Sequence, residues 1–172
     1  ENKVIDLIHI DQLLQPQKKE NYIFIMAGGL GKRLLPLTEN IPKPMIQINN
    51  KPILLRIIEK FVDQGFYKFF ISVNYKSDII KNFFGDGSNF NIEIKNIEEN
   101  KKLGTAGSLS LLNDYLKEDL IVINGDLITD IEFKNILDFH ESEKSKFTVV
   151  VRQYNYQVPF GVVNIIKNVI HS

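Results

Sequence analysis

A short stretch near residue 30 combines glycines with basic residues at a spacing that suits polyphosphate binding. Glycine has no side chain, so an anion can approach the backbone, and it tolerates the positive φ angles that turn successive N–H groups toward one point. Basic side chains beside such a loop balance the charge of the anion. The residues that combine these properties are Gly28, Gly29, Gly31, Lys32, Arg33 and Lys43.

Two widespread phosphate-binding loops do not fit this stretch. A P-loop that places its lysine at Lys32 needs glycine and Ser or Thr where the chain has Met26 and Arg33. A dinucleotide-binding fingerprint that starts at Gly29 needs glycine where the chain has Leu34, and an acidic residue about 20 positions further on. The loop therefore belongs to another class of phosphate site.

A candidate metal ligand follows the apolar run at residues 120–123. Asp126 comes after Asn124 and Gly125, so its carboxylate is expected to project from the end of a strand into a cleft. Magnesium prefers one or two carboxylates, with waters and substrate oxygens completing an octahedron. The alternative is an Asx-type turn in which the side chain only closes the loop.

Short apolar runs alternate with helical patterns along the chain, which is typical of an α/β domain with a largely parallel sheet. Strands are expected over 22–27, 68–73, 120–123 and 147–151. Helices are expected from 52 to the turn at 65, over 78–84 behind Ser77 as N-cap, from about 106, and over about 132–140. The candidate residues then follow the carboxyl ends of strands, where open α/β sheets bind ligands.

Longer motifs extend the pattern. The chain resembles the sugar-1-phosphate nucleotidyltransferases, whose signature GG-x-G-x-R-L-x-P-L-T is followed by P-K-P-M. The matching segments, in the order of that family, are Gly28–Thr38, Pro42–Met45, Leu103–Ser108, Asn124–Asp126 and Pro159–Val163. This resemblance implies a three-layer Rossmann-like fold with a mostly parallel sheet.

The resemblance also implies roles for individual residues. Arg33 would bind the β- and γ-phosphate oxygens that leave as pyrophosphate, Lys43 would bind the α-phosphate and the sugar phosphate, and Asp126 would hold Mg²⁺. Nucleotide contacts are expected from Ala27, Gly28, Gly29, Gly31, Lys32, Gly104 and Thr105, with Gly161 near the hexose. Lys32 could equally be a solvated side chain, and Gly161 a bulge in a strand. Glu98 or Glu99 could orient the second glycine turn, although a solvated charged face is the favoured interpretation.

Both ends of the chain depart from the family pattern. Residues 1–20 are expected to be a linker or the tail of a preceding CBS-like region, with an unrelated terminal segment as the alternative. Residues 21–172 are expected to form a catalytic domain that is incomplete at its C-terminus, because the second metal-binding aspartate and the acceptor segment of the family lie further on. We therefore expect weak binding of nucleoside triphosphate without transfer from these 172 residues, and either self-association or weak stability because apolar surface is left uncovered.

The composition narrows the class of protein. Lysine plus arginine equals aspartate plus glutamate, at 21 each, so no global field favours nucleic acid or an anionic membrane. Cysteine is absent, which excludes disulfides and thiolate metal sites, and the three histidines are scattered. No apolar run approaches the ~20 residues of a membrane span. A cytoplasmic location is the expectation.

These observations favour an enzyme that transfers a nucleoside monophosphate from a nucleoside triphosphate to a sugar-1-phosphate and releases pyrophosphate. GTP is the preferred donor, because the Asn124-Gly125-Asp126 form is common among mannose-1-phosphate guanylyltransferases, which the sequence resembles. Thymidylyl, uridylyl and cytidylyl transfer remain open. The alternative from a different class is a non-catalytic regulatory domain of the same fold that binds nucleotide without turnover.

Overall fold

A computed structural model describes residues 16–29, 31–99, 103–104, 106–112, 118–157, 161, 163–167 and 169–171. The chain divides into two compact units, of which the first ends at Phe139 and the second begins at His140. Each unit is described by itself. The predicted tail of a CBS-like region over 1–20 lies mostly outside the described residues, and only its last part enters the structure.

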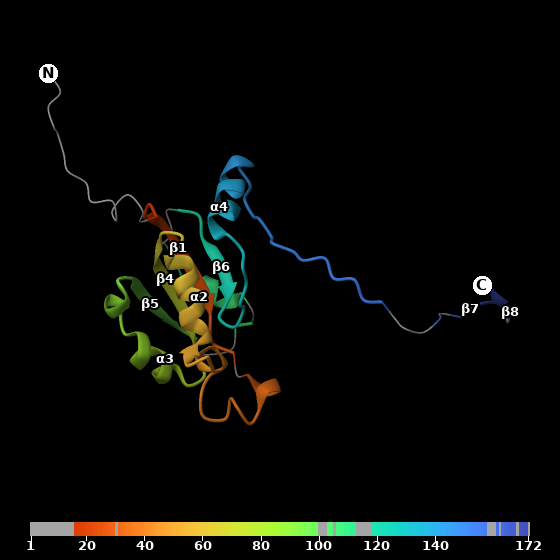
Figure 1. Cartoon of the computed structure of the whole chain (residues 1–172), viewed down its shortest axis with the longest axis horizontal. Helices are drawn as coiled ribbons and strands as arrows, with labels where there is room; N and C mark the ends of the chain where they lie inside the picture. The colour runs from red at the N-terminus through yellow and green to blue at the C-terminus, as the bar shows by residue number, and fades with distance from the viewer. Residues whose placement is uncertain are drawn as a thin grey trace, which may run out of the picture. The chain divides into compact units, whose positions relative to one another are not determined.

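The first unit is built on a four-stranded parallel sheet with the strand order β5-β4-β1-β6 (Figure 1). The strands are β1 (Lys19–Met26), β4 (Phe66–Val73), β5 (Glu93–Glu98) and β6 (Ile121–Asn124). Ile23, Phe24 and Ile25 are fully buried, as expected for a central strand that is covered on both faces. Three of the four predicted strands are confirmed, and β5 is an addition to them.

Three helices cover one face of the sheet. They are α2 (Ile53–Val62), α3 (Ser77–Phe84) and α4 (Phe133–Ser142). Their apolar side chains join Ile23, Ile25 and Ile123 of the strands in one large core. On the other face Phe24 and Phe70 pack with Leu112, which follows the 3₁₀ helix η4 (Gly107–Leu111). The mostly parallel sheet with helices confirms the predicted α/β fold class.

A tight hairpin precedes α2. Its strands β2 (Gln47–Ile48) and β3 (Lys51–Pro52) are antiparallel. Asn49 and Asn50 join them with φ angles of 49° and 60°, the conformation that type I′ turns require and that asparagine tolerates. Pro52 then occupies the N-cap of α2, so the helix begins at Ile53, one residue later than the sequence predicted.

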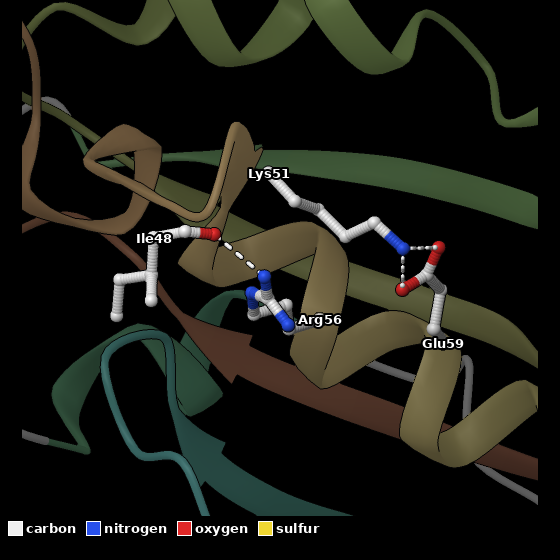
Figure 2. Close-up of polar contacts among 4 residues, drawn as sticks. All are labelled: Ile48, Lys51, Arg56 and Glu59. Carbon is white, nitrogen blue, oxygen red and sulfur yellow. Dashed lines mark hydrogen bonds and ion pairs between the residues drawn. The ribbon is translucent and has the colours of Figure 1, made fainter.

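Side chains of α2 tie this hairpin to the helix surface (Figure 2). Arg56 donates a hydrogen bond of 2.6 Å from Nη2 to the carbonyl of Ile48. Lys51 donates from Nζ to both carboxylate oxygens of Glu59, at 2.9 and 2.8 Å. These contacts hold the hairpin in place against α2. Because Lys43 lies shortly before the hairpin, α2 helps to fix the position of that lysine.

The structure corrects several of the expected elements. Residues 147–151 carry no helix or strand, although their β-branched composition predicted a strand. A strand needs neighbours that complete its hydrogen bonds, and propensity alone does not supply them. Where a helix was expected from about residue 106, the described residues form the 3₁₀ helix η4, which ends at Leu111. Lys76, with φ 50°, and not Ser77, is the N-cap of α3.

The second unit contains one hairpin, in which β7 (Asn164–Ile166) pairs antiparallel with β8 (Val169–His171). Within it, His140 Nδ1 and Thr148 Oγ1 lie 2.8 Å apart in a hydrogen bond. Among the helices of the described residues, none is long and apolar enough to span a bilayer.

Phe61 is the residue of α2 that we expect to carry the most packing energy. Its ring stacks on Phe133 at a centroid distance of 3.8 Å and meets the edge of Phe66 at 5.6 Å. Phe61→Ala is therefore expected to lower the free energy of unfolding by about 3–5 kcal/mol, measured by urea denaturation. Phe83→Ala is the matched control, because Phe83 is 42% exposed. An equal loss in both variants would contradict this packing scheme.

A polar cluster joins the beginnings of β1 and β4. Glu20 accepts a hydrogen bond from Tyr67 Oη at 2.7 Å and pairs with Lys68. The Lys68 ammonium, followed by the Tyr67 hydroxyl, lowers the pKa of the Glu20 carboxyl below its usual 4.5. The same bond to Glu20 raises the pKa of Lys68.

This cluster gives stability that depends on pH. Because the pKa of Glu20 is lowered in the folded state, its contribution is present above the usual 4.5 and is lost as the pH falls below it. Glu20→Gln is expected to lower the melting temperature at neutral pH, and the difference from the parent protein is expected to vanish in acid. Glu141→Gln, on an exposed face of α4, is the control. A difference for Glu20→Gln that persists unchanged into acid would disprove the assignment.

Candidate nucleotide-binding site

A cleft of about 580 Å³ opens where the carboxyl ends of β1 and β6 meet the glycine-rich loop. Its lining contains most of the residues that the sequence singled out: Ala27, Gly28, Gly29, Gly31, Arg33, Lys43, Gly104 and Asp126. Met26, Leu34, Pro44, Glu99 and Asn124 complete it. The parallel sheet therefore gathers segments that lie far apart in the sequence at one site.

The glycine loop follows β1 and lines the cleft. Ala27 is the last residue held to the sheet, through a 2.9 Å bond from its N–H to the carbonyl of Ser72. In the described part of the chain, no group accepts a hydrogen bond from the N–H of Gly28 or Gly29. A Cβ on Gly28 would lie only 3.2 Å from Glu99 Oε1. Gly28 thus has little room for a side chain, and the loop offers two unused donors to an anion.

Gly31 and Thr38 close the loop on itself. Gly31 has φ +62°, and its carbonyl accepts hydrogen bonds of 2.9 Å from Thr38 Oγ1 and from the N–H of Leu34. Thr38 is 1% exposed. The bonds shape the 3₁₀ turn η1 (Lys32–Leu34), which brings Arg33 to the cleft.

The backbone of Lys43 is held in place by its neighbours. It begins the 3₁₀ turn η2 (Lys43–Met45), with Pro42 as N-cap. Pro44 and Met45 are buried, and the carbonyl of Lys43 accepts a 3.1 Å bond from the N–H of Ile46. The two prolines restrict φ on either side of the lysine, so little backbone freedom is left to be lost when it binds a ligand.

Asp126 reaches the cleft through a close approach of two strands. The N–H of Gly125 donates a 2.8 Å bond to the carbonyl of Met26, and a Cβ on Gly125 would lie 3.0 Å from that oxygen. The side chain of Asp126 forms an ion pair with Lys43, 83 residues away in the sequence. The two side chains are 35% and 34% exposed, so solvent and ligands can reach them.

Magnesium fits this donor set best as part of a nucleotide complex. Among the described residues there is no group of three or more His, Cys, Asp or Glu side chains that could hold a metal ion by themselves. Asp126 supplies one carboxylate to the cleft, and Asn124 lies beside it in the lining. One carboxylate, with phosphate oxygens and waters, is the ligand set by which magnesium commonly binds nucleotides.

Glu99 is a site residue that the sequence interpretation placed on a solvated face. Its carboxylate lines the cleft and accepts a hydrogen bond from Ser72 Oγ, and Asn74 Nδ2 donates to its carbonyl at 2.6 Å. Glu98, in contrast, pairs with Lys81 and has a side chain that is 63% exposed. β5 ends at Glu98, so Glu99 is the first residue beyond the carboxyl end of a strand. Recognition of β5 in the sequence would have separated the two glutamates, but this strand was not predicted.

Some predicted site residues are not tested by the structure. Thr105 and the side chain of Lys32 lie outside the described residues. Gly161 belongs to the second unit, so its contact with the hexose stays a prediction.

Comparison with known proteins agrees with the fold and with the contents of the cleft. The sequence profile of the family described as nucleotidyl transferase matches residues 23–170. The chain therefore belongs to this family of nucleotidyl transferases.

Individual relatives lie within the same class. The chain is 36% identical over 143 residues to a mannose-1-phosphate guanyltransferase of Hypocrea jecorina, across 81% of this chain and 39% of that protein. It is 34% identical to that of Saccharomyces cerevisiae, again over 81% of this chain and 40% of the relative. The chain thus spans about 40% of the length of these relatives.

Solved structures show the same fold. HddC from Yersinia pseudotuberculosis, complexed with GMP-PN, superposes with a TM-score of 0.62 at 36% identity, over 70% of this chain and 54% of that one. A putative glucose-1-phosphate thymidylyltransferase from Bacillus anthracis gives a TM-score of 0.66 at 24% identity, over 72% and 51% of the two chains. The latter likeness concerns the fold alone.

Gly31 provides a test of the loop geometry. Gly31→Ala would place a Cβ 2.8 Å from Thr38 Cγ2 at a φ of +62°. We expect it to lower the free energy of unfolding by about 1–3 kcal/mol, measured by denaturation without ligand. Gly29→Ala is the matched control, because nothing lies within 4 Å of its Cβ position. Equal stabilities for the two variants would show that the loop is not held as described.

Proposed function

We propose that this chain forms the nucleotide-binding part of a sugar-1-phosphate nucleotidyltransferase that uses GTP. The observation that carries the proposal is the single cleft that combines the glycine loop, Arg33, Lys43 and Asp126. Membership in the nucleotidyl transferase family supports the same reaction class. The product is a nucleotide-activated sugar, and the substrates are a nucleoside triphosphate and a sugar-1-phosphate.

The reaction is an in-line displacement at the α-phosphorus of the nucleotide. A phosphate oxygen of the sugar-1-phosphate forms the new P–O bond, the bond between the α-phosphorus and the bridging oxygen breaks, and pyrophosphate leaves. No covalent nucleophile of the protein is required, so catalysis consists of positioning and charge stabilisation. The N–H groups of Gly28 and Gly29 donate to phosphate oxygens, and Arg33 offers its planar fork to the departing pyrophosphate.

Lys43 and Asp126 act nearer the reacting phosphorus. The compact ammonium of Lys43 neutralises the α-phosphate and the incoming sugar phosphate. Asp126, with Asn124 beside it, would hold Mg²⁺ that arrives with the nucleotide. Bound there, magnesium would neutralise phosphate charge and orient the oxygens for displacement.

Glu99 supports the preference for guanine. Guanine presents two adjacent donors on its Watson–Crick edge, N1–H and the N2 amino group, and a carboxylate accepts from both. Thymine and uracil present one donor between two carbonyl oxygens, which a carboxylate repels. Glu99 lies in the same cleft as Gly104, which the family resemblance places near the base. The curated relatives described above are named as mannose-1-phosphate guanyltransferases, which favours mannose-1-phosphate or a similar hexose phosphate as acceptor.

The direct test is pyrophosphate release by the full-length gene product with four nucleoside triphosphates and a panel of sugar-1-phosphates. GTP with a hexose-1-phosphate is expected to give the highest rate. If the protein binds nucleotide but releases no pyrophosphate with any combination of nucleoside triphosphate and sugar-1-phosphate, a regulatory domain is favoured instead.

Arg33→Ala is expected to reduce the rate of pyrophosphate release by about 10²-fold or more. The physical reason is the loss of a preorganised charge that stabilises the leaving group. Circular dichroism checks that the fold is unchanged, since Arg33 lies on an exposed turn at the cleft. Turnover near that of the parent protein would remove Arg33 from the reaction.

Glu99→Gln is expected to reduce the preference for GTP over UTP by about 10- to 100-fold in kcat/KM, because one acceptor becomes a donor that opposes the guanine amino group. Glu98→Gln is the matched control: it is adjacent, and its ion pair with Lys81 is exposed. An unchanged preference in Glu99→Gln would mean that other groups read the base.

A further inference from the structure

Lys43 and Asp126 neutralise each other in the cleft, and this contact has a consequence for metal binding. The ammonium contacts Asp126 Oδ2. Within the residues that the structure describes, no other cation pairs with this carboxylate. The acidic side chain that suits a metal is therefore already bound by the basic side chain that suits a phosphate.

A charged lysine and a divalent cation compete for such a carboxylate. The ammonium has three donors and no lone pair, so it cannot join the metal's coordination shell. Two positive charges at one carboxylate also repel each other, more strongly for a divalent ion than for a second lysine. Asp126 can thus bind Lys43 or a metal at Oδ2, but not both.

The backbone geometry allows the lysine to exchange partners. Lys43 is fixed at its Cα between Pro42 and Pro44, while its flexible side chain is about one-third exposed. Arg33, Gly28 and Gly29 line the same cleft as Lys43. A phosphate bound by these three residues would therefore present oxygen atoms near the Lys43 ammonium. The ammonium can then leave Asp126 for a phosphate without movement of the fold.

We propose that Lys43 guards Asp126 against metal ions until a nucleotide arrives. The phosphate draws the ammonium away, the carboxylate is released, and the metal binds Asp126 together with the nucleotide. This inference rests on the proposed function, in which Asp126 holds the metal. By thermodynamic reciprocity, the metal must strengthen nucleotide binding by the same factor as the nucleotide strengthens metal binding.

The proposal is tested by the affinity of the nucleotide-free protein for Mn²⁺, measured from the EPR signal of unbound Mn²⁺. Lys43→Met removes the charge but keeps the length of the side chain. It is expected to tighten Mn²⁺ binding by about 3- to 30-fold, from the lost ion pair and the lost repulsion. Lys43→Gln provides a second variant, and thermal melting confirms that each is folded. An affinity within about twofold of the parent protein in both variants would overturn the proposal.

A matched control tests whether freeing a carboxylate elsewhere on the protein also tightens Mn²⁺ binding. Lys51→Met frees Glu59, whose side chain is 44% exposed, away from the cleft. We expect it to leave Mn²⁺ affinity unchanged. The double variant Lys43→Met with Asp126→Asn is expected to lose the gain. A gain in the Lys51→Met control equal to that in Lys43→Met would also overturn the proposal.

A further arm distinguishes this inference from the proposed function. Preformed Mn²⁺–GTP is titrated calorimetrically into the parent protein and into Asp126→Asn. If the variant binds the complex as tightly as the parent protein, Asp126 is not the metal ligand and the metal assignment itself fails, with the inference. If Asp126→Asn weakens binding while Lys43→Met leaves Mn²⁺ affinity unchanged, the proposed function stands and only the guarding role is wrong.

Discussion

The parallel pairing of β1 with β4 on one side and β6 on the other is the constraint on which the site depends. Met26 lies in register with Ser72 of β4 and with Asn124 of β6. All three strands end at the same edge, so the chain segments that follow them converge there. The glycine loop follows β1, and Asp126 follows β6. If β6 were shifted in register against β1, Asp126 would move away from Lys43 although the sequence motifs would be the same.

Burial of the central strand makes this register specific. Ile23 and Ile25 face the helix-covered core, whereas Phe24 packs on Phe70 and Leu112 on the other face. A slip of one residue would exchange these faces and misplace every side chain of the strand. The apolar layers that stabilise the domain thus also determine where the charged groups of the cleft lie. Arg56 and the Lys51–Glu59 pair extend the same control to the segment after Lys43.

Most residues that line the cleft could be predicted from the sequence, because they occur in short motifs that follow recognisable strands. Gly28, Gly31, Arg33 and Asp126 were predicted as residues of one site for this reason, and all four line the same cleft. The contact between Lys43 and Asp126 was not predictable, since it depends on the tertiary fold. Glu99 was missed because it stands in a run of charged and polar residues that is typical of a solvated face.

The errors in secondary structure have similar causes. β5 lies at an edge of the sheet and has only two apolar residues, Ile94 and Ile97, among charged and polar ones, and this weak pattern was overlooked. Residues 147–151 have the composition of a buried strand, but composition does not supply the neighbouring strand that pairing requires. Local patterns therefore predicted β1, β4 and β6 well, and failed for β5 and for residues 147–151.

The most direct measurement for the whole account is the position of the metal and the triphosphate in crystals grown with Mn²⁺ and a non-hydrolysable GTP analogue. The anomalous signal of manganese is expected at a coordination distance of about 2.0–2.3 Å from a carboxylate oxygen of Asp126. The phosphates are expected against the amides of Gly28 and Gly29, with Lys43 turned from Asp126 to a phosphate oxygen. Manganese and triphosphate bound elsewhere, with the Lys43–Asp126 pair intact, would contradict the account.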